Sequence, residues 1–199
     1  MHTLNIPTPC KEQLNRYLSQ LKSDEKFQHY HFQGLALEKL FKLYPKNSDI
    51  LSILLKVSTL NDFYSTNIFS TYSVAKQIES LNIDKRLEEG DEILVADIQK
   101  VTIRNKQRNF YSFATKYCSH HKPDNYPIYD SYVDRVLRYF RKKDKFYSFS
   151  NDDLKDYPKF KQILVKFQQH YGIECSVRDL DRYLWLLGKE HFNKHKEPL

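Results

Sequence analysis

One carboxylate stands out among the residues whose type and position could do chemistry. Asp130 ends the segment YPIYD, in which Pro127 favours an extended chain, and it directly precedes a helical pattern that starts near Ser131. As the N-cap of that helix it would accept backbone N–H groups, and the helix dipole would favour its negative charge. A carboxylate fixed in this way can stabilise a cation that develops in a transition state. A cap without any catalytic role explains the same position, so both roles stay open.

Two clusters of cationic residues flank Asp130 in the sequence. The first is the polar connection RNKQR, with Arg104, Lys106 and Arg108, which is expected to join two helices as a helix–turn–helix. Such a connection can present backbone amides and cations to a phosphate, although a solvated loop has the same composition. The second cluster lies on and after the helix that Asp130 would cap; its members are Arg135, Arg138, Arg141, Lys142, Lys143 and Lys145. Cations on both sides of one acid favour a nucleic-acid groove.

The composition narrows the classes of protein to consider. The chain has 199 residues and a formal net charge of +7, which fits a polyanionic partner but is also found in proteins that bind none. Its 3 Cys are far apart and form no CxxC, so neither a zinc ribbon nor an iron–sulfur cluster is encoded, and a reducing cytoplasm is the expected location. No cofactor or metal is expected. No apolar run reaches the roughly 18 residues of a membrane span.

Apolar residues recur at helical spacing along most of the chain, and strand-like alternation is scarce. Pro45 should stop the second of two helices within residues 11–44, and Ser48 or Asp49 should cap a strongly apolar third helix. Further helices are expected over residues 71–81, 90–101, 110–117, 133–140, 160–167 and 178–192. The pattern predicts one compact all-α domain over residues 1–199, either undivided or with two lobes.

The segment YPIYDSYVDRVLRYF resembles the signature of the helix-hairpin-helix DNA glycosylase superfamily. In that signature an apolar–Pro–apolar segment leads into an Asp, and a helix with the pattern x-x-V-x-R-V follows. The residues that match it are Pro127, Asp130, Val133, Arg135 and Val136. DLDRYLWLLGKEHF is similar to the family's late helix, in which an apolar run ends in Leu-Gly, and ILSILLKVSTLND looks like its early buried helix. These segments occur in the family's order over residues 48–192, with the helices of residues 11–44 packing on that region.

The sequence departs from the family at two places. The family's hairpin is a Gly-rich turn of the type Leu-Pro-Gly-x-Gly, whereas this chain has VTIRNKQRN in that interval, without Gly or Pro. The lytic members carry a Lys where this chain has Tyr111 or Ser112. Monofunctional members also lack that Lys. The resemblance therefore implies a monofunctional glycosylase, with no lyase step unless Lys106 or Lys116 reaches the site.

The activity that the resemblance implies is excision of a damaged or mispaired base. The base would be flipped out of the duplex, and Asp130 would stabilise the oxocarbenium-like transition state and orient the attacking water. The resemblance implies that the nucleic acid is DNA. The residues expected to contact it are Asn61, Arg104, Lys106, Arg108, Lys116, His120, His121 and Arg135. The residues expected to line the pocket are Ser112, Tyr126, Tyr129 and Tyr132. Ordinary packing, turns and caps explain each of these residues taken singly.

Two functions of other classes fit the same residues. One is a non-catalytic module of the same fold that recognises nucleic acid by phosphate contacts and shape. The other is a helical domain whose basic surface serves a protein partner. Binding that weakens steeply with salt would separate the nucleic-acid functions from the protein-interaction function.

Overall fold

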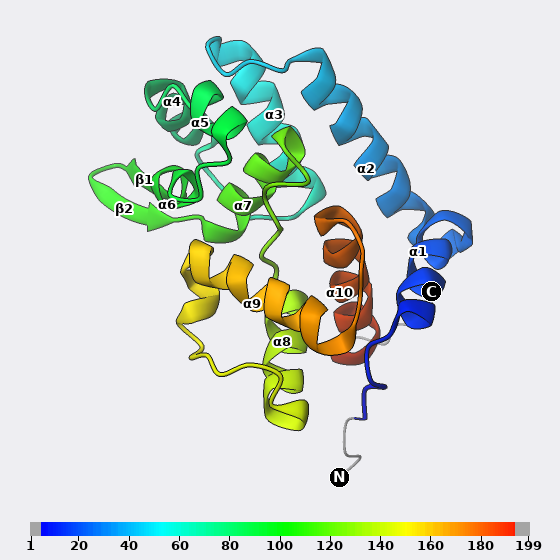
Figure 1. Ribbon diagram of the computed structural model, residues 1–199. Helices are drawn as coiled ribbons and strands as arrows, with labels where there is room; N and C mark the ends of the chain where they lie inside the picture. The colour runs from blue at the N-terminus through cyan, green and yellow to red at the C-terminus, as the bar shows by residue number, and fades with distance from the viewer. Residues whose placement is uncertain (1–4, 194–199) are drawn as a thin grey trace. The chain divides into compact units, whose positions relative to one another are not determined.

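The computed structural model describes residues 5–193, and its chain divides into two compact units (Figure 1). The central unit is Phe32–Tyr129, and the terminal unit is formed by Met1–His31 together with Asp130–Leu199. Within the described residues there are ten α-helices, one short 3₁₀ helix and a two-stranded sheet. The all-α class expected from the sequence is therefore confirmed.

The terminal unit is built from both ends of the described chain. Its elements are α1 (Lys11–Ser23), the first part of α2 (Glu25–Leu43), α8 (Ser131–Asp144), η1 (Asp153–Lys155), α9 (Tyr157–Tyr171) and α10 (Val177–Phe192). Helix α10 packs against α8 and α1, and its apolar face is buried. Ser176 caps α10 by accepting the backbone N–H of Asp179 at 3.1 Å.

The central unit is a cluster of short helices around α3. After the remainder of α2 it contains α3 (Ile50–Phe63), α4 (Thr71–Ser80), α5 (Asp84–Glu89), α6 (Leu94–Gln99), β1 (Lys100–Ile103), β2 (Lys106–Asn109) and α7 (Tyr111–His121). Helix α3 packs against α4 and α7, and α6 packs against α7. The Asp49 carboxylate caps α3 by accepting the backbone N–H groups of Leu51 and Ser52, as one of the two expected caps.

A β-hairpin occupies residues 100–109, so the helix–turn–helix expected there is wrong. Strands β1 and β2 pair antiparallel, with Val101 opposite Arg108 and Ile103 opposite Lys106. The β-branched run Val-Thr-Ile favours extended backbone over another helical turn. The helix expected through Val101 therefore ends at Gln99.

The turn of the hairpin uses an uncommon residue pair. Arg104 and Asn105 have φ angles of 47° and 61°, which a tight type I′ turn requires at both central positions. Asn tolerates this left-handed backbone, but Arg adopts it at a cost of about 1 kcal/mol. The absence of the usual Asn-Gly pair explains why the turn gave no clear signal in the sequence.

Two further boundaries differ from expectation. Residues 84–89 form the short helix α5, which ends at Gly90 with a left-handed φ of 69°. His120 and His121 belong to the last turn of α7 and not to the Pro-bounded loop in which they were expected. No helix among residues 5–193 is long and apolar enough to cross a membrane.

Candidate nucleic-acid interface

The hairpin carries four cations that project into solvent. These residues, which together with the two strands and their turn we call the basic hairpin, are Lys100, Arg104, Lys106 and Arg108. All four are exposed, and within residues 5–193 none of their side chains forms a hydrogen bond or ion pair. From Ile98 to Lys122 the sequence contains no Asp or Glu. The charge of the basic hairpin is therefore not compensated locally.

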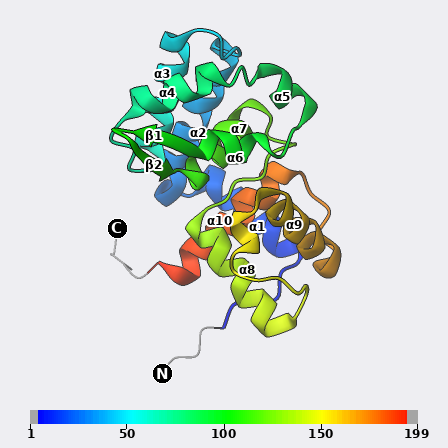
Figure 2. The ribbon, with the colours of Figure 1, turned by 90° about the vertical axis from the view of Figure 1, so that its left-hand side faces the viewer.

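Val101 attaches the hairpin to the central unit. It is 1% exposed, and β1 packs against α4 and α6 (Figure 2). Every residue of β2 is exposed, so β2 forms the outer edge of the ribbon. A two-stranded ribbon with one anchored strand and one cationic edge has the dimensions that fit the major groove of duplex DNA or follow a phosphate backbone.

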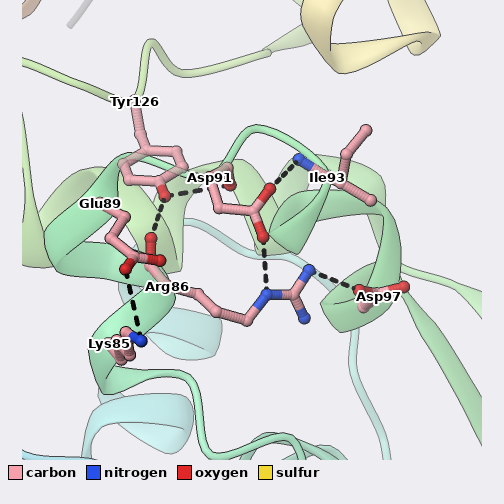
Figure 3. Close-up of polar contacts among 7 residues, drawn as sticks. All are labelled: Lys85, Arg86, Glu89, Asp91, Ile93, Asp97 and Tyr126. Carbon is pink, nitrogen blue, oxygen red and sulfur yellow. Dashed lines mark hydrogen bonds and ion pairs between the residues drawn. The ribbon is translucent and has the colours of Figure 1, made fainter.

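Arg86 fixes the end of the helix from which the hairpin starts (Figure 3). Its Nε donates to Asp91 at 2.7 Å, and its Nη2 donates to Asp97 at 2.8 Å. Asp91 also accepts the backbone N–H of Ile93 at 2.9 Å, just before α6. Because Asp97 lies in the last part of α6, this pair of ion pairs orients the helix that leads into β1. Arg86 compensates one of the two carboxylate charges, which leaves a net charge of −1 on this group of three residues.

The second basic cluster is largely used within the terminal unit. Arg135 donates to the carbonyl oxygen of Phe192 at 3.2 Å, and Arg138 pairs with Asp134 at 2.8 Å. Arg141 donates to the carbonyl oxygen of Phe149 at 2.6 Å and to Asn151 Oδ1 at 3.0 Å. Lys143 donates to the carbonyl oxygen of Ile6 at 2.7 Å. These contacts hold chain segments together and leave Lys142 and Lys145 as exposed members without such a bond.

Asp130 caps α8, as its position in the sequence predicted. Its backbone is extended, with φ −142° and ψ 157°, and its Oδ1 accepts the backbone N–H of Tyr132 at 2.7 Å. Burial raises the pKa of the Tyr132 phenol, and the charge of Asp130 adds to this shift. The carboxylate is thus held in one orientation beside a partly buried aromatic residue.

Three residues expected at the site lie together in the central unit. Ser112 donates to the carbonyl oxygen of Tyr129 at 3.0 Å and accepts from Lys116 Nζ at 2.5 Å. Lys116 is 3% exposed, and its Nζ lies 5.1 Å from the centre of the Tyr64 ring. Thr115 Oγ1 accepts the backbone N–H of Tyr129 at 3.1 Å. These bonds hold the segment that ends at Tyr129 against α7.

Tyr126, expected to line a base pocket, is instead a core residue (Figure 3). It is 0% exposed, and its hydroxyl donates to the carbonyl oxygens of Asp91 at 3.1 Å and Arg86 at 3.3 Å. Burial raises the pKa of this phenol. A fully covered ring cannot stack on a base, so Tyr126 supports the turn before α6.

Asn61 and His120 have specific partners within the central unit. Asn61 Oδ1 accepts the Thr66 hydroxyl at 2.7 Å and the backbone N–H of Ile68 at 2.9 Å, and its Nδ2 donates to the carbonyl oxygen of Ile68 at 3.2 Å. This is the turn role that the sequence left open for Asn61. His120 Nε2 lies 3.1 Å from the Tyr64 hydroxyl.

A buried polar group, which we call the Asn47 cluster, was not predicted. Asn47 Oδ1 lies 2.7 Å from Lys56 Nζ, 2.6 Å from the Tyr117 hydroxyl and 3.2 Å from His121 Nε2. Its Nδ2 donates to Asp84 at 2.7 Å. The cluster connects α3, α5 and α7 through one loop residue. Its members are far apart in the sequence, and no motif links them.

The charges in the Asn47 cluster shift one another's ionisation. Burial lowers the pKa of Lys56 to about 8, although Asp84 and Asp49 oppose the shift. Burial and the charge of Lys56 lower the pKa of His121 to about 2, so its imidazole is neutral. The phosphate contact predicted for His121 has no support from this geometry, because Nε2 faces Lys56 at 3.3 Å and Asn47. Within residues 5–193 no group of His, Cys, Asp and Glu could hold a metal ion.

Comparison with known proteins places the chain in a family. Residues 13–125 match the family model HI_0787_N, described as an N-terminal domain. An uncharacterised protein of Haemophilus influenzae is 52% identical over 145 residues, which cover 72% of this chain and 70% of that protein. This chain belongs to the HI_0787_N family. No solved structure matches it significantly.

The residues that match the family model include three features described above for the central unit. The basic hairpin, the Arg86 ion pairs and the Asn47 cluster all lie within residues 13–125. Asp130 lies beyond that range. The hairpin and the elements that hold it thus belong to the segment by which the family is defined.

Proposed function

We propose that this protein binds nucleic acid through the basic hairpin. The observation that carries the proposal is the set of four exposed cations on one ribbon without internal partners. By contrast, most of the second basic cluster is engaged in bonds within the terminal unit. Cations that are already extended into solvent can contact phosphates without giving up a bond.

Protection of a sheet edge offers another reason for charges on a hairpin. Lys and Arg on an exposed edge strand prevent pairing with a second chain. That role explains Lys106 and Arg108 on β2 and also Lys100 on β1, since each strand of a two-stranded sheet has one edge without a strand partner, but it does not explain Arg104 in the turn. Arg104 in particular keeps a cation at the tip of the ribbon at a conformational cost of about 1 kcal/mol. Recognition of a polyanion accounts for all four positions.

Removing two hairpin cations tests the proposal. For Lys106→Ala/Arg108→Ala we expect binding of a fluorescent oligonucleotide to weaken about tenfold at moderate salt. The slope of log affinity against log salt should become shallower by about 1.4 to 1.8 units, since each phosphate contact contributes about 0.7 to 0.9. Fluorescence anisotropy over a salt series measures both quantities. Arg104→Gly should weaken binding as well, while the relaxed turn keeps the hairpin stable.

Lys142→Ala/Lys145→Ala is the matched control, because it removes the same charge from exposed positions in the terminal unit. Its affinity and salt slope should stay close to those of the wild type. Equal weakening by both double variants would show that net charge, and not the hairpin, determines binding. A wild type without salt-dependent binding at low ionic strength would overturn the proposed function.

Base excision at Asp130 is the second candidate function, and the fixed orientation of its carboxylate favours it. Asn is as good an N-cap as Asp, whereas Ala is not. A catalytic Asp130 therefore predicts that Asp130→Asn abolishes base release from damaged duplexes while the free energy of unfolding is retained. A cap without catalysis predicts that only Asp130→Ala has an effect, a loss of about 1 kcal/mol in unfolding. Thermal unfolding and a base-release assay on the same three proteins separate these outcomes.

A further inference from the structure

Two exposed aromatic residues lie at the start of the helix that packs against the hairpin. Phe69 is 99% exposed and Tyr72 is 59% exposed. Ser70 is the N-cap of α4, so Phe69 precedes the cap and Tyr72 lies in the first turn. Because β1 packs against α4 and this helix of 10 residues is only about 15 Å long, the start of α4 lies no more than about 15 Å along the helix axis from its contact with β1.

The usual structural reason for an apolar residue at the position of Phe69 does not apply. A hydrophobic residue before an N-cap commonly packs on the fourth helical residue as a hydrophobic staple. Here that partner would be Val74, which is 0% exposed and packed in the core, while Phe69 is almost entirely in solvent. Neither the helix start nor the core accounts for the exposed ring.

The loop that presents Phe69 is held at defined points. Asn61 bonds both the backbone N–H and the carbonyl oxygen of Ile68, and the Ile68 side chain is 3% exposed. The residue next to Phe69 is therefore anchored on its backbone and on its side chain. Because the neighbouring backbone is already ordered, a ligand that stacks on Phe69 restricts the torsions of this side chain without having to order the loop.

We propose that Phe69 and Tyr72 stack on unpaired bases, so that with the basic hairpin they form a site for single-stranded nucleic acid. This inference rests on the proposed function and names its substrate class. Single-strand sites combine a cationic track for the phosphates with aromatic rings for the bases, because every base has a face on which a ring can stack. Both components are present on β1, β2 and the start of α4. Intact duplex would engage the cations but keep its bases stacked away from the rings.

The test compares Phe69→Ala/Tyr72→Ala with the wild type on a 12-nucleotide oligo-dT or oligo-U and on a duplex of equal length. For the single strands we expect the affinity to fall about tenfold for each ring removed, as is typical of base–aromatic stacking. The affinity for the duplex should remain within about twofold, because the phosphate contacts are unchanged. Phe69→Trp should retain single-strand binding. The oligo-dT and oligo-U arms show whether the strand is DNA or RNA.

Leu51→Ala/Leu55→Ala is the control, because it removes exposed apolar side chains from α3 in the same unit, at 68% and 49% exposure. It should leave both affinities unchanged. Photocrosslinking of 5-iodouracil oligonucleotides to Phe69 or Tyr72 gives a direct readout of stacking in the wild type. Unchanged single-strand affinity in the aromatic variant, or equal loss on duplex, would overturn the inference while the proposed function stands. If instead the proposed function is wrong, the wild type will bind neither the single strands nor the duplex.

Discussion

Lys56→Met lowers the free energy of unfolding by about 3–5 kcal/mol; this is the largest effect we expect from a single substitution. Lys56 is 0% exposed, and its Nζ donates to the carbonyl oxygens of Tyr44 at 3.0 Å and Lys46 at 2.9 Å as well as to Asn47. Met fills the same space but donates no hydrogen bond. Two backbone carbonyl groups and the Asn47 amide oxygen would then lose the donor that the buried Lys56 ammonium supplies.

Denaturant unfolding followed by circular dichroism measures this effect. The matched control is Lys39→Met, which changes an exposed Lys of α2 and should stay within about 0.5 kcal/mol of the wild type. A loss of less than about 1 kcal/mol for Lys56→Met would show that the buried ammonium is dispensable and that the Asn47 cluster does not stabilise the central unit.

The Asn47 cluster also makes stability depend on acidity. The folded pKa of His121 is about 2, and its ordinary value is 6.5. Below pH 6.5 the unfolded chain therefore takes up a proton that the folded chain does not, so this contribution to stability falls as the pH falls. The free energy of unfolding of the wild type should decrease between pH 6.5 and pH 4, and His121→Gln should flatten that dependence. Lys56→Met should flatten it in part, because the charge of Lys56 is one cause of the shift.

Gly188→Ala should have the second-largest effect, a loss of about 1–3 kcal/mol in the free energy of unfolding. A Cβ at Gly188 would lie 2.6 Å from Tyr132 Cβ and 2.9 Å from the Tyr132 carbonyl oxygen. Helices α8 and α10 would therefore have to separate at the turn that Asp130 caps. The Leu-Gly pair that ends the apolar run of α10 thus has a packing reason in this chain.

Gly34 provides the control for that prediction. It lies in the helix α2, and a Cβ there would meet no atom within 4 Å. Gly34→Ala should raise the free energy of unfolding by about 0.5–1 kcal/mol, since Ala is the better helix former. Thermal unfolding of both variants measures the two shifts. A loss for Gly188→Ala together with a gain for Gly34→Ala supports close helix packing at Gly188. A gain for both variants would mean that α8 and α10 leave space for a methyl group there.

The caps were predictable from the sequence, but the hairpin was not. Asp130, Asp49 and Ser176 act within three residues of their own positions, so a short stretch of sequence contains the whole interaction. The strands have only four residues each, and the apolar spacing of α6 continues into Val101. Helical periodicity and a short strand cannot be told apart over such a length.

The sequence predicts which cationic residues the candidate site contains, but it does not predict which side chains are engaged in hydrogen bonds within the protein. Lys106 and Arg108 were recognised because cationic runs are visible in the sequence, and they are exposed in the structure. Arg135 and His121 were also expected to contact the nucleic acid, but Arg135 bonds the carbonyl oxygen of Phe192 and His121 bonds the Asn47 amide oxygen. The partners in these bonds are 57 and 74 positions apart in the sequence, so the bonds depend on the fold and not on a local sequence pattern. Phe69 was missed because an apolar residue in a loop gives no sign of its exposure.

The two segments of the terminal unit are synthesised at different times, because they lie at opposite ends of the chain. The two units therefore fold in a fixed order during synthesis. The central unit is one continuous segment and contains its own core, so it can fold as soon as it has emerged from the ribosome. Helix α1 is made first but finds its partners last, because Tyr17 bonds Glu190 at 2.6 Å and Tyr183 bonds Gln13. Until α10 is made, the apolar face of α1 has no place to pack. A ribosome that pauses late in the chain would thus hold a folded central unit beside an unprotected helix, which is the stage at which a chaperone would bind.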